Sequence, residues 1–103
     1  MKFKVSAWSN GKVANGFRIG KLNRDSCFES NCSEIILRLG TEDIVVQLTP
    51  GFWRSCPEIR HPSIREWLEA NGFHRWQKRR PPSFDMCKCS ANTFVLLDAQ
   101  VDR

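Results

Sequence analysis

The residues of this chain best suited to bind a ligand are cations that lie close in sequence to tryptophans. Trp8 follows Lys2 and Lys4, and Arg75 directly precedes Trp76. Positive side chains neutralise phosphates, and an exposed aromatic ring can stack on a nucleobase. The pattern predicts a nucleic-acid-binding face, for DNA or RNA, made of Lys2, Lys4, Trp8, Lys12, Arg18, Lys21, Arg24, Arg75, Trp76, Lys78, Arg79 and Arg80.

The distribution of charge supports the same face. Residues 1–24 carry six bases and no acid, residues 25–69 carry eight acids and four bases, and residues 70–103 carry six bases and three acids. If the two basic ends meet in the fold, they form one positive surface that attracts phosphate-rich polymers or acidic proteins. Two alternatives stay open: the cations only solvate the surface, and each tryptophan belongs to the core.

Five cysteines and two histidines are the candidates for metal chemistry. The ligand pairs that lie close in sequence are Cys87 with Cys89, Cys56 with His61, and Cys27 with Cys32. Structural zinc sites commonly use C-x-x-C spacing, which does not occur here. We therefore expect reduced cysteines that pack as small apolar residues, with no metal and no cofactor.

Catalytic chemistry has weaker support. A nucleophilic Cys56 needs a base or a positive field, and Arg54 and His61 are close in sequence. His61 precedes Pro62, however, which is typical of a helix cap or a surface residue. A metal-dependent nuclease needs clustered carboxylates. Glu42 and Asp43 fall in a predicted turn, and Glu66 and Glu69 on a helix surface, as ordinary solvated acids do. The sequence predicts a protein that is not an enzyme.

Bulk properties set the class of protein. A chain of 103 residues with 41% hydrophobic residues is expected to form a single domain over residues 1–103. No apolar run reaches the length of a membrane span, and no apolar block follows the first charges as in a secretory signal. An odd number of cysteines without such a signal favours reduced thiols and a cytoplasmic location.

Alternation of apolar and polar residues predicts the strands. In the run of residues 2–8, Phe3, Val5 and Ala7 face inward, with Trp8 on the polar side. Asn-Gly pairs at residues 10–11 and 15–16 predict turns, whose backbone N–H groups could add phosphate contacts. The predicted strands are Lys2–Trp8, Phe17–Leu22, Glu34–Leu39, Asp43–Leu48, Phe84–Cys89 and Thr93–Leu97.

The main helix is predicted over Ser63–Asn71. Ser63 and Glu66 form a capping-box pattern, and Asn71-Gly72 is a typical helix end. Two shorter helical turns are expected, one capped by Asn23 or Asp25 and ending near residue 29, and one over residues 52–56 before Pro57. The predicted class is α+β: a strongly bent antiparallel sheet or open β-barrel, with one main helix (about residues 63–71) and one or two short helices.

This order of elements resembles the DNA-binding pseudobarrel fold of plant transcription-factor domains and restriction-enzyme specificity domains. Residues 17–22 (FRIGKL) lie where those domains have a polar strand, and residues 67–72 (WLEANG) lie where they have the second helix. The basic Pro-Pro loop that follows departs from that pattern. Separately, residues 52–57 (FWRSCP) and 81–84 (PPSF) look like segments of small bacterial proteins carried on mobile elements as gene cassettes, which implies origin and size class only.

The function expected from these observations is that of a binding module for DNA or RNA. A protein-interaction module or homo-oligomeric accessory protein is the first alternative, and a small-ligand pocket inside the bent sheet is the second. We expect no membrane contact.

Overall fold

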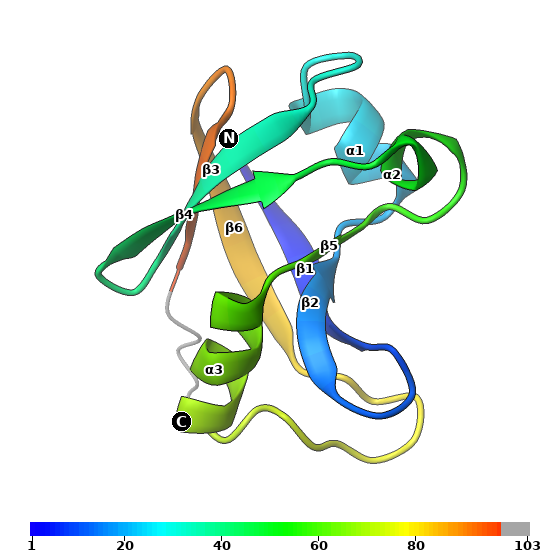
Figure 1. Cartoon of the computed structure of the whole chain (residues 1–103), viewed down its shortest axis with the longest axis vertical. Helices are drawn as coiled ribbons and strands as arrows, with labels where there is room; N and C mark the ends of the chain where they lie inside the picture. Colours follow the sequence, from blue (N-terminus) through cyan, green and yellow to red (C-terminus); the bar gives the residue numbers. More distant parts are fainter. Residues whose placement is uncertain (98–103) are drawn as a thin grey trace.

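The structure is a computed structural model that describes residues 1–97. One seven-stranded sheet curls around the core, and three short helices lie at its margins (Figure 1). The elements are β1 (Lys2–Ser9), β2 (Ala14–Arg18), α1 (Lys21–Cys27), β3 (Glu34–Leu39), β4 (Glu42–Gln47), α2 (Pro50–Arg54), β5 (Glu58–Arg60), α3 (Pro62–Ala70), β6 (Ser83–Ser90) and β7 (Thr93–Leu96). Residues 98–103 of the predicted domain lie outside the described residues.

The strand order in the sheet is β4-β3-β7-β6-β1-β2-β5. The end strands β4 and β5 approach each other, so the sheet is bent nearly into a barrel. The predicted α+β class with a bent sheet, one main helix and two short helices is therefore confirmed. The sheet is mixed and not antiparallel throughout, because β7 turns back from β6 and then pairs in parallel with β3.

The alternation read from the sequence decides which side chains fill the core. Phe3, Val5 and Ala7 are buried on β1, and the hairpin of β3 and β4 buries every second residue. Six of the seven phenylalanines are buried, and edge-to-face contacts such as Phe17 with Phe84 connect them. The interior of the sheet is thus filled by side chains, and polar residues of β1 remain on its outer side.

Strand β2 departs from the prediction. It begins three residues before Phe17, and Lys21 already starts a helix. Asn15-Gly16 lies within β2 and makes no turn. A side chain at Gly16 would collide with the carbonyl oxygen of Ile59. The absence of a side chain at Gly16 therefore lets β5 approach β2 closely. Gly20, at φ +87°, ends the extended segment between β2 and α1.

The helix caps also differ from the prediction. His61, and not Ser63, is the N-cap of α3: its Nδ1 accepts a hydrogen bond of 2.9 Å from the Ser63 backbone N–H. Pro62 occupies the first helical position, where its missing N–H costs nothing. Neither residue proposed as a cap of α1 has that role, since Gly20 precedes the helix and Asn23 donates to the carbonyls of Lys4 and Ile19.

No helix within residues 1–97 combines the length and the apolar character needed to cross a membrane.

Candidate nucleic-acid interface

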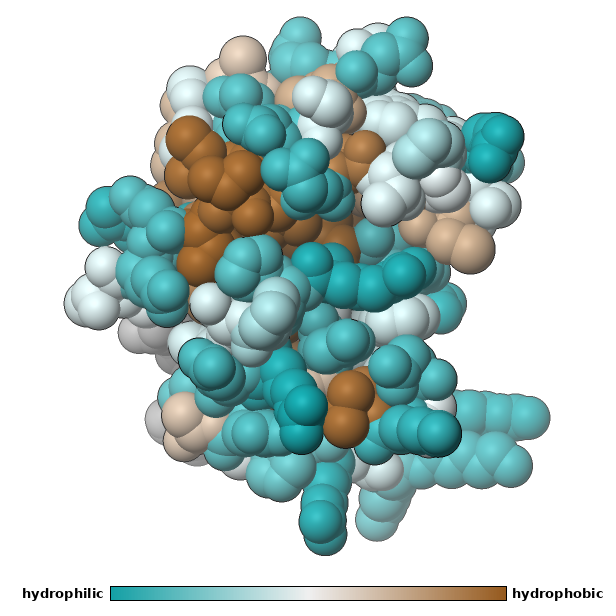
Figure 2. Space-filling view, viewed as in Figure 1, coloured by the Kyte–Doolittle hydropathy of each residue, from teal (hydrophilic) through white to brown (hydrophobic). Residues whose placement is uncertain are grey.

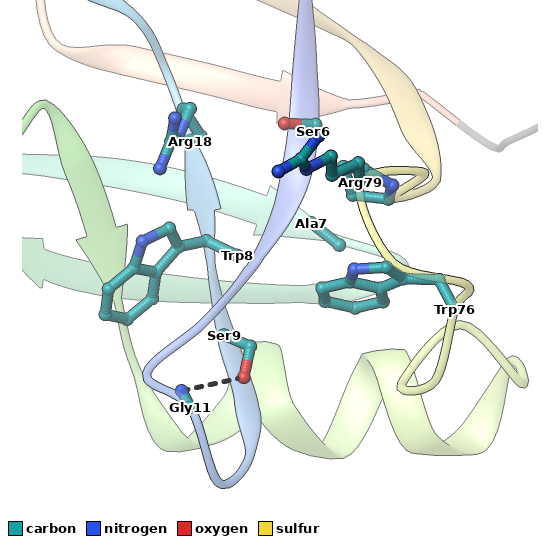
Figure 3. Close-up of a pocket in the computed structure, with 9 residues that line it drawn as sticks. Ser6, Ala7, Trp8, Ser9, Gly11, Arg18, Trp76 and Arg79 are labelled. Carbon is teal, nitrogen blue, oxygen red and sulfur yellow. Dashed lines mark hydrogen bonds between the residues drawn. The ribbon is translucent and has the colours of Figure 1, made fainter.

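The two basic ends of the chain meet at one pocket beside the last residues of β1. Trp8 and Arg18 come from β1 and β2, whereas Trp76 and Arg79 come from the loop between α3 and β6 (Figure 3). We call this the tryptophan pocket; it has a volume of about 380 Å³ and is lined by Ser6, Ala7, Trp8, Ser9, Gly11, Arg18, Trp76, Arg79 and Pro81. Two indole rings and two guanidinium groups thus converge on one hollow.

The register of β1, β2 and β5 positions Trp8. Trp8 pairs with Gly16, and Gly16 pairs with Arg60. Because Gly16 has no side chain, Arg60 reaches across it, and its guanidinium carbon lies 4.7 Å from the centroid of the Trp8 ring. A cation over an aromatic face is attracted by the ring quadrupole. This contact covers one face of the half-buried Trp8 ring and holds the ring in place.

The loop of residues 71–82 brings Trp76 and Arg79 to the same pocket. Trp76 packs against the hydrophobic core, and the Ala7 backbone N–H donates to the Pro82 carbonyl at 2.9 Å. A turn closed by the Arg80 N–H and the Gln77 carbonyl contains Arg79 at φ +65°. For a residue with a β-carbon, this left-handed conformation raises the free energy of the folded state by about 1–3 kcal/mol. The fold therefore holds Arg79 at the pocket in a strained backbone conformation.

Two smaller hollows belong to the same basic region. One, of about 290 Å³, shares Ser6 and Arg18 with the tryptophan pocket and adds Lys4. The other, of about 280 Å³, is lined by His61, Arg65 and Arg60, and Arg60 lies over the ring of Trp8. The three hollows run across β1, β2 and β5. We call the surface that contains them the basic track.

Acidic groups moderate the positive charge of the basic track without cancelling it. Glu58 lies between Arg18 and Arg60, at 3.9 Å and 3.8 Å from their guanidinium nitrogens. Lys4 pairs with Asp85 at 3.0 Å. Within residues 1–97 no carboxylate lies within ion-pair distance of the remaining exposed cations of the predicted face, which are Lys2, Lys12, Lys21, Arg75, Lys78, Arg79 and Arg80.

Not every residue of the predicted face lies at the pocket. Lys2 is on the same side of β1 but at its far end, and Lys21 is exposed at the start of α1. Arg24 has a structural role: it is 6% exposed and donates hydrogen bonds to the Asp25 carboxylate and the Phe52 carbonyl. A buried guanidinium with these partners is not presented to a ligand, so Arg24 does not belong to the interface.

The loop between β1 and β2 also differs from expectation. Its backbone N–H groups already have partners within the loop: Gly11 donates to Ser9 Oγ, and Lys12 and Val13 both donate to Asn10 Oδ1. They are therefore not available to phosphates. What the loop offers is the exposed ammonium group of Lys12 beside the pocket residue Gly11.

Sequence reasoning missed Arg60 and Arg65 of the basic track. Both lie in the segment with an excess of acids, and Arg60 belongs to β5, a three-residue strand that was not predicted. A usable signal was the spacing of Arg60 and Glu58, which alternate around Ile59 as in a strand that buries only its central residue.

The cysteines and histidines form no competing site in the described part of the chain. All five cysteines are free, and no group of three or more His, Cys, Asp or Glu side chains within residues 1–97 is arranged to hold a metal ion. Cys27 donates toward Met1 Sδ and Cys32 toward the Glu34 carbonyl. The Nδ1 atom of His61 is occupied by the helix cap.

Comparison of the chain with protein-family models, with curated proteins and with solved structures finds no match.

Proposed function

We propose that this chain is a nucleic-acid-binding module that contacts DNA or RNA through the basic track and the loop of residues 71–82. The observation that carries the proposal is the convergence of Trp8, Arg18, Trp76 and Arg79 at one pocket. Guanidinium groups are well suited to phosphate oxygens, and indole rings to the faces of bases. We place the module in a reducing compartment such as the cytoplasm, which its five free cysteines support.

The distribution of the remaining charge supports this orientation. The hairpin of β3 and β4 carries the acids Glu34, Glu42 and Asp43. A polyanion is therefore repelled by these acids and attracted to the basic track. Such asymmetry favours binding in one orientation.

The first test is the salt dependence of binding. Four phosphate contacts, from Lys4, Arg18, Arg60 and Arg79, predict that the logarithm of the affinity falls with the logarithm of the salt concentration at a slope of about −3 to −4. Fluorescence anisotropy of labelled oligonucleotides measures this slope. Absence of binding to both DNA and RNA at low salt would overturn the proposal.

Charge-reversal variants locate the surface. Arg18→Glu and Arg79→Glu are expected to weaken binding and to lower the salt slope by about one phosphate contact each. Arg54→Glu is the matched control, because Arg54 is also exposed but lies on α2 and lines none of the three hollows of the basic track. Equal effects at Arg54 and Arg79 would mean that only net charge matters.

A second candidate function, association with another copy or another protein, is favoured by one observation. Ile36 and Val45 are opposite each other on β3 and β4, and 36% and 49% of their surfaces are exposed. Figure 2 shows hydrophobic surface gathered over this hairpin. Because β4 ends the strand order, its outer edge is a template for another strand.

Light scattering over a range of protein concentrations tests this second candidate. A mass that rises with concentration, and that returns to the monomer value in a Val45→Lys variant, is the result expected from association through β4. A monomer at every concentration excludes self-association and leaves the nucleic-acid proposal unaffected.

A further inference from the structure

We propose that the tryptophan pocket takes an unpaired base, so that the ligand of the basic track is a single-stranded segment of DNA or RNA and not a duplex. This inference rests on the proposed function and assigns its ligand class. It is carried by the walls of the pocket, by the contact of Trp8 with Arg60 and by the cations of the two smaller hollows.

The walls of the pocket suit a planar aromatic group. The rings of Trp8 and Trp76 stand on either side of the segment Ser6–Ser9 of β1, with Ala7 between them (Figure 3). Base faces stack on indole rings irrespective of base identity. In a duplex, neighbouring bases cover both faces of each base, and a side chain reaches only the edges unless the base is flipped out at a free-energy cost. A pocket lined by two indole rings therefore favours a base that is already unpaired.

Trp8 is prepared for this role before any ligand binds. The Arg60 guanidinium lies over its ring, 4.7 Å from the centroid, and Trp8 also lines the tryptophan pocket. Arg60 is itself held by Glu58, whose side chain is only 9% exposed. Side chains that are ordered in advance lose less entropy on binding. Glu58 is thus a positioning residue that acts through Arg60.

The cations of the two smaller hollows suit a continuous chain of phosphates. Arg18 and Lys4 line the hollow that shares Ser6 with the tryptophan pocket, and Arg60, which lies over the Trp8 ring, lines the second hollow with His61. A free nucleotide carries its phosphates at one end only and engages one of these groups of cations. A strand with a base in the tryptophan pocket has a phosphate both before and after that base, so it is able to engage both groups.

The experiment compares three forms of one labelled oligonucleotide of about 12 nucleotides, a length within the site sizes of small single-strand-binding folds. The forms are the single strand, the same strand annealed to its complement, and the same strand with abasic sites. Anisotropy at low salt is expected to give at least about tenfold tighter binding to the intact single strand than to either other form. A mononucleotide added as competitor is expected to displace the strand only at large excess.

Trp8→Ala and Trp76→Ala variants test the pocket itself. Each is expected to lower the affinity for the single strand by about 5-fold to 150-fold, the range for loss of one stacked base, and to leave duplex binding unchanged. Trp53→Ala is the control, because Trp53 is also partly buried but lines a different pocket with Leu48 and Pro50. Circular dichroism establishes that each variant is folded.

Trp76 packs on the core, so its alanine variant can fail to fold. Tryptophan fluorescence of the unmodified chain then gives the result: quenching by the single strand and not by the duplex supports the base pocket. Equal affinity for strand and duplex, with no quenching and no effect of Trp8→Ala, overturns the base pocket and leaves the proposed function standing. Absence of binding to any nucleic acid overturns both the base pocket and the proposed function. Displacement by a mononucleotide at equal concentration assigns the pocket to a free nucleotide and also overturns the inference.

Discussion

The guanidinium of Arg60 lies over the ring of Trp8, 4.7 Å from its centroid, although an entire strand separates the two residues in the sheet. The contact exists because the residue between them in the register is Gly16. One glycine therefore serves two purposes. It lets β5 approach β2 closely, and it leaves the space in which Arg60 meets Trp8.

The first prediction concerns this glycine. Gly16→Ala is expected to lower the free energy of unfolding by about 1–3 kcal/mol, because the new methyl group would collide with the carbonyl oxygen of Ile59 and displace β5. Gly51→Ala is the control: its methyl group would meet only Thr49 Oγ1 at 3.5 Å, an ordinary contact. Urea denaturation compares the two. Equal stabilities would mean that β2 and β5 do not lie as closely as described.

The second prediction separates stability from binding at Arg79. Arg79→Gly relieves the positive φ of +65°, so the free energy of unfolding is expected to stay level or to rise by up to about 1 kcal/mol. Nucleic-acid affinity should fall, because the guanidinium at the pocket is lost. Asn31→Gly is the matched control, since Asn31 has φ +61° but lies at another pocket. Thermal unfolding and anisotropy together test the pair; equal binding by both variants would remove Arg79 from the site.

A third prediction addresses the cap of α3. His61→Ala removes the acceptor of the Ser63 N–H and is expected to cost about 0.5–2 kcal/mol of stability. Ser63→Ala should cost clearly less, since the Ser63 hydroxyl is not the capping group. Denaturant titration of both variants measures the difference. A larger loss at Ser63 would restore the capping box that the sequence pattern suggests.

The fourth prediction concerns pH. Arg38 donates two hydrogen bonds to the Asp43 carboxylate, at 2.8 Å and 3.1 Å, and they hold the pKa of Asp43 below its ordinary value of about 3.9. A carboxyl with a lowered pKa in the folded state stabilises the fold above the ordinary pKa. That contribution is lost as the pH falls through the lower, folded-state pKa. The stability difference between wild type and Asp43→Asn should therefore be small at neutral pH and vanish in acid, as measured by denaturation at several pH values. A difference independent of pH would exclude the ion pair as its cause.

Local sequence patterns predicted the elements whose structure depends on near neighbours. The hairpin of β3 and β4 follows from two alternating runs joined by Gly40-Thr41, and the end of α3 follows from Asn71-Gly72. The sequence could not reveal elements that depend on distant partners. Strand β5 has only three residues and is held by β2. The buried Arg24 donates a hydrogen bond to the carbonyl of Phe52, which is 28 residues away in the sequence.

The same distinction applies to the site. The sequence identified the cations and aromatics of the tryptophan pocket, which are Trp8, Arg18, Trp76 and Arg79. It did not show that they meet at one pocket, because this depends on the path of the loop of residues 71–82. Arg60 was not identifiable, because its contact with Trp8 arises only from the register across Gly16.

The position of β7 has a consequence for how the chain folds. Among the described strands β7 is the last to be synthesised, yet it lies between β3 and β6 and pairs with both. Until β7 is made, the hairpin of β3 and β4 is not joined to β6, β1 and β2 through the sheet. Pairing between segments so far apart in sequence slows folding, because loop-closure entropy is lost before the contacts form. Completion of this sheet is therefore expected to be a late and slow event that follows synthesis of β7.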